Sequence, residues 1–230
     1  MNQIILNKQN FFNMKVLELY AGSRSIGKIC EKLGHEVFSI DIFQFGKIDL
    51  ILDCEFLKLE YLPFIPDMIW SSPPCTSYSI SAISYHRFEN TNPKSEFAEK
   101  SDRMNINNIK LINDILKINP NMKFYIENPR SVFRKMDFIK GINRTTVTYC
   151  SYGDIRMKPT DIFSNNIYDM FNLKGWNPRP ICFNGNTKCH HEASPRSSRS
   201  GTQGLKNNHE KSKIPEQLCI EIIQSTQKLF

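Results

Sequence analysis

The chain has 230 residues, of which 40 % are hydrophobic and 23 % charged, and it carries a formal net charge of +7. This length suits one α/β domain with a small appended lobe, and the composition excludes a disordered or fibrous chain. No apolar run approaches the roughly 18 residues of a membrane span, and the polar, Asn-rich N-terminus lacks a signal peptide's apolar stretch. We therefore expect a cytoplasmic protein without membrane partners, whose seven cysteines are reduced.

Short apolar runs alternate with helical patterns in the first half of the chain. Residues 1–13 have no clear period and are expected to form an N-terminal arm. Lys15–Tyr20 has the form of a buried parallel strand, and Ser25 is expected to cap a helix that Gly34 ends. The next three strands are expected at Glu36–Ile40, Asp49–Leu52 and Met68–Trp70.

The second half continues the alternation after a polar stretch. Ser81–Lys100 has few apolar anchors and is expected to be a long loop. A helix is expected from Ser101 to about Ile118, followed by strands at Lys123–Ile126 and Thr145–Tyr149. Alternating strands and helices predict a doubly wound α/β fold with a mostly parallel sheet and right-handed crossovers.

The amino-acid composition changes after residue 165. Residues 166–210 are expected to form a small, irregular basic lobe, and a helix opened by Pro215 within 211–230 is expected to pack back on the sheet. Residues 171–213 include eight basic residues and only two acidic ones. A lobe with this positive charge can bind phosphates. The charged residues are Lys174, Arg179, Lys188, Arg196, Arg199, Lys206, Lys211 and Lys213, against Glu192 and Glu210.

Turn and acidic residues gather where the expected strands end. Gly22 follows the first strand, Asp41 ends the second and Asp53 ends the third. Ligands bind beyond the carboxyl ends of the strands in open parallel sheets. A tight turn into a helix, with a carboxylate ending the next strand, is the layout of a nucleoside cofactor site. The alternative is that Gly22 only makes a turn and Asp41 is only a strand-end charge.

A thiol and a carboxylate occupy the same edge. Cys75 follows Pro73 and Pro74 at the end of the fourth strand, and the two prolines fix where its thiol points. Glu127 ends the fifth strand. Together these residues indicate a nucleophile beside an acid. The alternatives are a structural thiol at Cys75 and a solvated charge at Glu127.

A group of cysteines and histidines falls in the basic lobe. Cys182, Cys189 and His190 lie in a segment too polar to fold by hydrophobic burial alone, and a structural zinc ion would order it. Cys150 or one of the two histidines, His190 and His191, completes four ligands. The alternative is exposed cysteine and histidine side chains in a loop.

Five segments, in this order, resemble the DNA cytosine-5 methyltransferase family. The resemblance covers about residues 15–165 and 211–230. VLELYAGSRSIG is similar to the family's cofactor motif, SSPPCTSYS to its Pro-Cys nucleophile motif, and YIENP to its Glu-Asn motif. TYCSYGDIRMKPTDIFSN resembles the later segment with basic catalytic residues, and SKIPEQLCIEI the terminal motif. The recognition region between them is much shorter than is usual in the family.

The resemblance implies a Rossmann-like methyltransferase domain over residues 14–165 that binds S-adenosylmethionine. Asp41 would hold the ribose and Asp53 the adenine amine. Glu18 stands where the family commonly has Asp, and Ser23 lies in a region usually richer in glycine. The residues implied in cofactor binding are Glu18, Tyr20, Ala21, Gly22, Ser25, Asp41, Ile42, Asp53, Cys54 and Pro74.

The resemblance also implies a mechanism. The Cys75 thiolate would add to C6 of cytosine, while Glu127 would engage N3 and the exocyclic amine. The family's basic residue is represented by Lys158 or by Arg156, two residues earlier. The target base must leave the duplex to reach Cys75, so DNA would bind with a flipped or single-stranded cytosine. The loop Ser81–Lys100 is placed to close over this base.

Other functions compete with methylation of DNA. RNA or another cytosine-bearing substrate is a near alternative because the lobe is small, and for the same reason a DNA target site is expected to be short or relaxed. Ser72-Pro73-Pro74 also fits an amino-methyltransferase motif, except that Cys75 replaces the aromatic residue. A catalytically silent nucleic-acid-binding protein of the same fold is the third alternative. A monomer is expected in each case.

Overall fold

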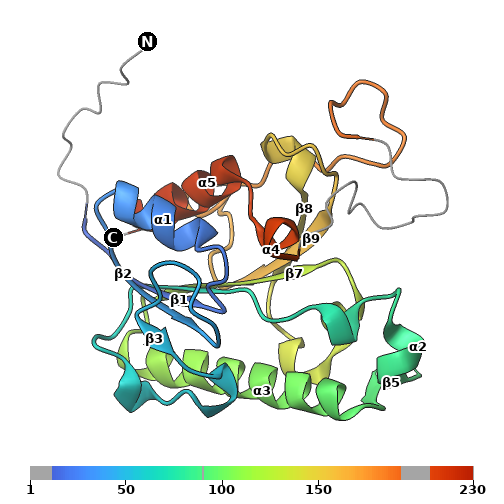
Figure 1. The fold of residues 1–230 in the computed structure, drawn as a ribbon. Helices are drawn as coiled ribbons and strands as arrows, with labels where there is room; N and C mark the ends of the chain where they lie inside the picture. The colour runs from blue at the N-terminus through green and yellow to red at the C-terminus, as the bar shows by residue number, and fades with distance from the viewer. Residues whose placement is uncertain (1–11, 90, 193–207, 230) are drawn as a thin grey trace.

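The computed structural model describes residues 12–89, 91–192 and 208–229, and its centre is a twisted sheet with helices on both faces (Figure 1). Within these residues the sheet has seven strands in the order β3-β2-β1-β4-β7-β9-β8. The strands are β1 (Lys15–Leu19), β2 (Glu36–Asp41), β3 (Leu50–Ile51), β4 (Met68–Ser71), β7 (Lys123–Pro129), β8 (Arg144–Thr148) and β9 (Pro159–Ser164).

Five neighbouring strands of this sheet run parallel. β1 is central to this part, and Val16 lies opposite Val37 of β2 and Met68 of β4. β4 pairs in parallel with β7, and β2 with β3. β9 runs antiparallel to both of its neighbours, β7 and β8. The carboxyl ends of β1, β2, β4 and β7 therefore meet at one edge of the sheet.

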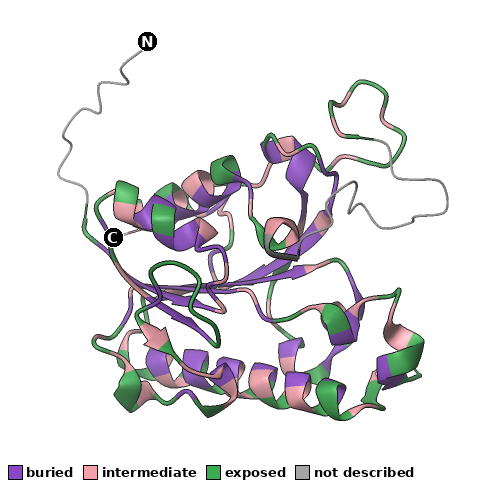
Figure 2. Ribbon diagram, in the orientation of Figure 1, coloured by how far each residue is buried: buried purple, intermediate pink, exposed green. Residues whose placement is uncertain are grey.

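Helices cover the two faces. α1 (Ser25–Lys32) and α5 (Glu216–Gln227) lie on one face, and the long α3 (Glu96–Ile118) lies on the other (Figure 1). Figure 2 shows their buried sides turned to the sheet and their exposed sides outward. The shorter elements are α2 (Ile83–His86), α4 (Asn208–Ser212), the pair β5 (Arg87–Phe88) and β6 (Asn92–Pro93), and the 3-10 helices η1 (Cys54–Phe56), η2 (Leu59–Tyr61), η3 (Thr76–Tyr78), η4 (Val132–Lys135), η5 (Asp137–Ile139) and η6 (Tyr149–Tyr152).

Alternate residues of the strands supply the two hydrophobic layers. Leu17 and Leu19 of β1 point to the α3 face, where they join Ile112 and Ile115. Val16 points to the opposite face and packs in the cluster that includes Ile222 of α5. The sheet is thus buried on both sides, as a doubly wound fold requires. None of the helices in the described residues combines the length and apolarity that a membrane crossing needs.

The architecture confirms the expected doubly wound, mostly parallel sheet, with three corrections. Ser81–Lys100 is not one loop, because it contains α2, β5, β6 and the first turn of α3. α3 begins at Glu96 and is capped by Ser95, so Ser101 lies inside it. β9 was not expected from the sequence, and it inserts between β7 and β8. Residues 1–11 of the arm, together with Arg196, Arg199 and Lys206, lie outside the described residues.

Candidate active site

A cavity of about 410 Å³ opens beyond the carboxyl ends of β1, β4 and β7. Its wall combines the loop after β1, the loop after β4, the end of β7, and the chain that enters α5. The lining residues are Glu18, Tyr20, Ala21, Gly22, Ser23, Ser25, Trp70, Ser72, Pro73, Pro74, Cys75, Thr76, Glu127, Pro129, Lys158, Lys211, Ser212 and Ile214. The expected cofactor turn, the thiol and the acid therefore share one cavity.

The loop after β1 is held in a sharply turned shape. Tyr20, Gly22 and Arg24 all have positive φ, near 50°. This conformation is unfavourable for residues other than glycine, so the surroundings must enforce it at Tyr20 and Arg24. One hydrogen bond that stabilises this conformation runs from the backbone N–H of Gly22 to Oδ2 of Asp41, at 2.9 Å. Asp41, expected to hold a ribose, thus also fixes the loop.

Glu18 is a buried carboxylate behind this loop. Its Oε1 accepts from the backbone N–H of Gly27 at 2.9 Å, and its Oε2 accepts from the hydroxyl of Ser39 at 2.8 Å. Burial raises the pKa of Glu18, although these donors and nearby Arg24 oppose the shift. Although Glu18 borders the cavity, its oxygens join β1, α1 and β2. A positioning role accounts for these contacts.

Cys75 sits on the loop after β4. The side-chain amide of Asn128 donates to the carbonyl of Pro73 at 3.2 Å, which fastens this loop to β7. Burial raises the pKa of the Cys75 thiol above its ordinary value, the Lys158 charge lowers it, and the Glu127 charge raises it. Both charged groups are therefore close enough to control the fraction of thiolate.

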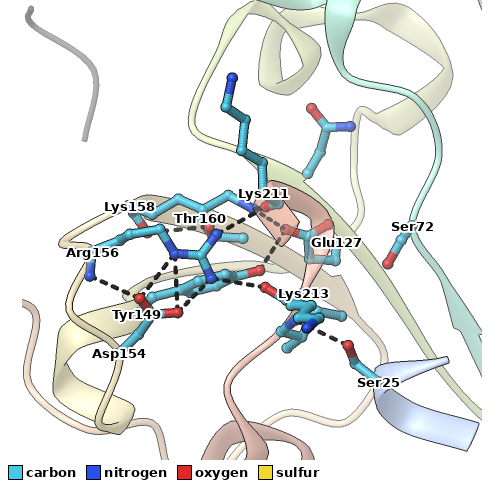
Figure 3. A network of polar contacts seen from close by, with 12 residues as sticks. Ser25, Ser72, Glu127, Tyr149, Asp154, Arg156, Lys158, Thr160, Lys211 and Lys213 are labelled. Atoms are coloured by element: carbon cyan, nitrogen blue, oxygen red, sulfur yellow. Dashed lines mark hydrogen bonds and ion pairs between the residues drawn. The ribbon is translucent and has the colours of Figure 1, made fainter. Parts of the chain in front are cut away.

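Glu127 reaches the cavity from β7 and is 6 % exposed. The hydroxyl of Tyr149 donates to its Oε1 at 2.8 Å. The Lys158 ammonium lies 3.9 Å from the same oxygen. Burial, followed by the Glu127 charge, raises the pKa of Tyr149 well above its ordinary value, so its hydroxyl remains a donor. The carboxylate is thus oriented by a fixed hydrogen bond and a nearby cation (Figure 3).

Lys158 lines the cavity, as does Lys211. It has a positive φ of 24° directly before Pro159, a backbone shape that costs free energy and marks functional positions. Its ammonium donates to the carbonyl of Lys211 at 3.2 Å and lies 4.6 Å from the centre of the Tyr149 ring. These contacts hold the charge beside Glu127.

Arg156 lies behind the cavity wall and is not among its lining residues. It forms a buried ion pair with Asp154. The same guanidinium donates to the backbone carbonyls of Lys211 at 3.0 Å and Lys213 at 3.1 Å (Figure 3). Arg156 therefore fixes the chain that forms one wall of the cavity.

The entry to α5 closes the wall against α1. Ser25, expected to cap α1, is instead the first residue of that helix, and Arg24 occupies the N-cap position without a side-chain cap. The hydroxyl of Ser25 accepts from the backbone N–H of Ile214 at 3.1 Å. The first and last segments of the described fold therefore meet at the cavity.

Four residues expected at the far end of the cofactor do not line the cavity: Asp41, Ile42, Asp53 and Cys54. Oδ2 of Asp53 pairs with Lys100 at 2.6 Å, and Oδ1 accepts from the backbone N–H of Glu55. Burial alone would raise the pKa of Asp53, but these two partners lower it. Ile42 is exposed and Cys54 is buried. Their roles in binding stay predictions.

A buried ion pair supports the nucleophile loop from below. Arg87 pairs with Asp102 of α3 at 2.6 Å and also donates to the carbonyl of Ser77 at 2.9 Å. The hydroxyl of Tyr78 donates to Asp102 at 2.8 Å, and the Arg87 guanidinium lies 4.3 Å from the Tyr78 ring centre. The segment after Cys75 is thus tied to α3.

The cysteine and histidine group has a different membership from the one expected. Cys150, Cys182 and Cys189 come together with His191. The Nε2 atom of His190 lies 3.0 Å from the carbonyl oxygen of Asp154 instead. The side chains of these two adjacent histidines point in different directions, so only that of His191 lies among the cysteines.

Several residues of the site were not singled out from the sequence. Tyr149 ends an expected strand, and nothing in its spacing indicates that it contacts Glu127. Gly27 could have been recognised from the sequence. A glycine inside a helix is unfavourable, so its presence indicates that another group packs closely there. A Cβ at Gly27 would lie 2.4 Å from Oε2 of Glu18.

A known protein with a similar sequence is described as a probable methyltransferase. No protein-family model matches the chain. A protein of Frog virus 3 (isolate Goorha), described as "Probable DNA (cytosine-5)-methyltransferase", is 25 % identical over 143 residues, which are 61 % of this chain. The match spans 65 % of that protein's length, just under two thirds.

Solved structures similar to this one include two methyltransferases. That of Entamoeba histolytica, EhMeth, has a TM-score of 0.49 and 15 % identity, with 66 % of this chain and 52 % of the other covered. The Dnmt2 methyltransferase of S. pombe has a TM-score of 0.44 and 15 % identity, with 66 % and 49 % covered.

Proposed function

We propose that this chain, whose resemblance to the DNA cytosine-5 methyltransferases the sequence similarity confirms, transfers a methyl group from S-adenosylmethionine to C5 of cytosine in DNA. One observation carries the proposal: Cys75, Glu127 and Lys158 line the same cavity as the loop Tyr20–Gly22. A thiol, an acid and a cation that converge on a cofactor turn are the groups that this reaction requires.

The cavity suits the methionine end of the cofactor. Tyr20, Ala21 and Gly22 border it on one side and Cys75 on the other, so a group held by the loop faces a base held beside the thiol. Asp41 is placed at the end of β2, where a ribose would follow. Bound S-adenosylmethionine supplies an electrophilic methyl group.

Cys75 makes the cytosine ring reactive in this proposal. Its thiolate adds to C6, a carbon–sulfur bond forms, and the displaced electron pair moves toward C5 and N3. C5 would then take the methyl group, while the sulfonium sulfur of the cofactor would keep the bonding electron pair and leave as a neutral thioether. Removal of the C5 proton by a base returns the electron pair, and the bond between C6 and Sγ breaks. The thiolate is regenerated, so the chain is unchanged at the end of the cycle.

Glu127 and Lys158 receive separate roles. The contacts with Tyr149 and Lys158 both use Oε1 of Glu127, and we assign Oε2 to N3 and the exocyclic amine. Lys158 favours the Cys75 thiolate because its charge lowers the pKa of the thiol. Arg156 is a positioning residue, since it fixes the wall made by residues 211–213.

The proposal includes the organisation of the chain. Residues 14–165 bind the cofactor and carry the chemistry, 166–210 form the lobe that faces the target, and 211–230 return to the sheet. The cytosine reaches Cys75 by flipping from the duplex or from single-stranded DNA. We propose a monomer, in a cytoplasmic setting that keeps the cysteines reduced, because all seven are free thiols.

Transfer of labelled methyl groups to DNA tests the proposal. Mixed-sequence duplex and single-stranded DNA are incubated with the protein, and the products are analysed as nucleosides. We expect 5-methylcytosine with the wild-type protein and with Lys117→Ala, an exposed residue near the end of α3 that pairs with Asp114 and does not line the cavity. We expect none with Cys75→Ala. A 5-fluorocytosine oligonucleotide should form a covalent adduct with the wild type alone.

Each other outcome has a defined meaning. Methyl groups on the exocyclic amine would contradict the thiol mechanism and support an amino-methyltransferase. Transfer only to RNA of the same sequence would contradict the DNA substrate while keeping the chemistry. Binding of nucleic acid without transfer to any of these substrates would favour a catalytically silent protein.

A further inference from the structure

Four soft ligand side chains from two distant segments converge beside the active site. Cys150 belongs to η6, directly after β8, while Cys182, Cys189 and His191 belong to the segment 177–192. Their three Sγ atoms and one imidazole nitrogen all lie within 4.8 Å of one another. Thiolates and imidazole are the ligands that zinc prefers in structural sites.

The spacing of these atoms fits a tetrahedral ion. Zinc–sulfur bonds of about 2.3 Å place the ligand atoms of a tetrahedron roughly 3.8 Å apart. Sγ of Cys182 lies 3.6 Å from Nδ1 of His191. A cluster this compact needs only small side-chain movements to close around one ion.

The segment 177–192 lacks the usual source of stability. None of its residues is buried, and it contains no helix or strand. Its backbone is nevertheless placed against the sheet by a few polar contacts. The N–H of Cys182 donates to the hydroxyl of Thr148 at 2.8 Å, and that of Glu192 donates to the carbonyl of Ile155 at 2.9 Å. Without a hydrophobic core, a metal cross-link would supply the missing free energy.

The turn between the two lobe cysteines supports a thiolate. The side-chain amide of Asn186 lies 3.4 Å from Sγ of Cys182 and donates to it. The backbone N–H of Cys189 donates to the carbonyl of Asn186 at 3.2 Å. Gly185, with φ of 88°, allows the reversal of the chain. N–H groups that donate to metal-bound sulfur and orient it are typical partners of such sites.

We infer that Cys150, Cys182, Cys189 and His191 bind one structural zinc ion. Four protein ligands fill a tetrahedral site, so the ion has no open position for substrate and does not act in catalysis. It fastens the segment 177–192 to η6. Tyr149, which precedes Cys150, donates to Glu127, so the same anchor steadies the acid of the active site. The inference does not rest on the proposed methyl transfer.

Metal analysis of the purified chain tests the inference. The protein is prepared under reducing conditions, supplied with zinc, freed of excess ion by gel filtration and analysed for metal per chain. We expect one zinc per chain for the wild type and for two controls, His190→Gln and Cys75→Ser. These remove a neighbouring imidazole and a thiol outside the cluster. We expect Cys182→Ser and His191→Gln to lose the ion.

Two further readouts identify the ligands. Cobalt substituted for zinc should show thiolate charge-transfer bands and the intense visible bands of tetrahedral coordination, both absent from Cys182→Ser. In the native wild type, zinc should protect Cys150, Cys182 and Cys189 from alkylation, and a chelator should expose them together. This comparison uses the wild type alone, so it decides the matter even where a variant fails to fold.

Three results would overturn the site. The first is an absence of metal from the wild-type protein after zinc has been supplied and the thiols reduced. The second is a Cys182→Ser variant that retains as much zinc as the wild type. A disulfide among the three cysteines in the freshly reduced and refolded protein would also contradict a metal site. Methyl transfer is not measured in any of these experiments, so their failure leaves the proposed function untouched.

Discussion

The edge of the sheet around Cys75 and the segment 177–192 are stabilised in different ways. The loops that carry Tyr20 and Cys75 extend from strands whose two faces pack in hydrophobic layers, and Figure 2 shows these strands as largely buried. The segment 177–192 buries no residue and depends on polar contacts with η6 and its neighbours. Hydrophobic burial supplies most of the stability of a folded domain, so the two regions should respond very differently to similar substitutions.

This difference assigns separate tasks to the two regions. A buried scaffold can hold Cys75, Glu127 and Lys158 in one arrangement while the chemistry proceeds. A segment joined by polar contacts, and by the zinc ion that we propose, can vary in sequence between the metal ligands without disturbing that arrangement. We interpret the segment 177–192 as a surface whose sequence can vary, while the buried scaffold keeps the residues around Cys75 in place.

Two arginines that each stack on a tyrosine provide the sharpest test. The Arg87 side chain is fully buried where it stacks on Tyr78 and pairs with Asp102, whose side chain is 16 % exposed. Arg179 stacks on Tyr152 and pairs with Glu221, and these two side chains are 40 % and 30 % exposed. Arg87→Met leaves a buried carboxylate unpaired, so we expect a loss of about 3 kcal/mol in the free energy of unfolding. Arg179→Met should cost less than about 1 kcal/mol.

Urea unfolding monitored by circular dichroism measures both values. Equal losses for the two variants would contradict the comparison, because they would mean that the lobe contributes as much to global stability as the catalytic edge does. The conservative variant Arg87→Lys keeps the charge but not the two-pronged pairing, and should recover part of the loss.

The glycine inside α1 is a second test of the catalytic edge. Ala in place of Gly usually stabilises a helix by up to about 1 kcal/mol. At Gly27 the new Cβ would lie 2.4 Å from Oε2 of Glu18, so we expect Gly27→Ala to destabilise the protein by about 2 kcal/mol. Thermal unfolding of the single and double variants checks this. Glu18→Asp, one methylene shorter, should relieve the clash, and strictly additive losses would exclude a direct contact.

The charges around Cys75 give a third test, this time of chemistry. Burial raises the pKa of the thiol, and the Lys158 charge lowers it. Lys158→Met removes the lowering charge, so the thiolate should form at higher pH than in the wild type. Glu127→Gln removes a charge that raises the pKa and should shift the profile to lower pH. The rate of Cys75 alkylation, followed by mass spectrometry across pH, measures both shifts. Unchanged profiles would place both charges too far from the thiol.

Most of the fold followed from the sequence because its signals are local. Short apolar runs with turn residues after them located β1, β2, β4 and β7 to within a few residues. β9 was not recognised, although β8 precedes it by only a few residues, because its antiparallel insertion between β7 and β8 has no local signature. Residues 81–100 were read as one loop because buried Arg87 is polar, and its burial depends on Asp102.

The candidate site shows the same limit. Gly22, Cys75 and Glu127 could be singled out because turns and strand ends mark them. Our proposal of Lys158 over Arg156 depends on the structure, because the sequence does not indicate that Arg156 pairs with Asp154 and donates to the backbone of residues 211–213. His191 could not be separated from His190 by spacing, because two adjacent residues differ only in the direction that the backbone gives them.

The start of α3 gives the smallest expected effect and tests a boundary that the sequence placed wrongly. The hydroxyl of Ser95 accepts from the backbone N–H of Ala98 at 3.2 Å, whereas that of Ser101 donates to the carbonyl of Phe97 inside the helix. Ser95→Ala should therefore cost about 1 kcal/mol. Ser101→Ala loses a local bond but gains helix propensity, so its effect should stay below about 0.5 kcal/mol. Urea unfolding of the two variants compares them, and a larger loss at Ser101 would mean that α3 begins there. In that case residues 96–100 would return to the loop beside the active site.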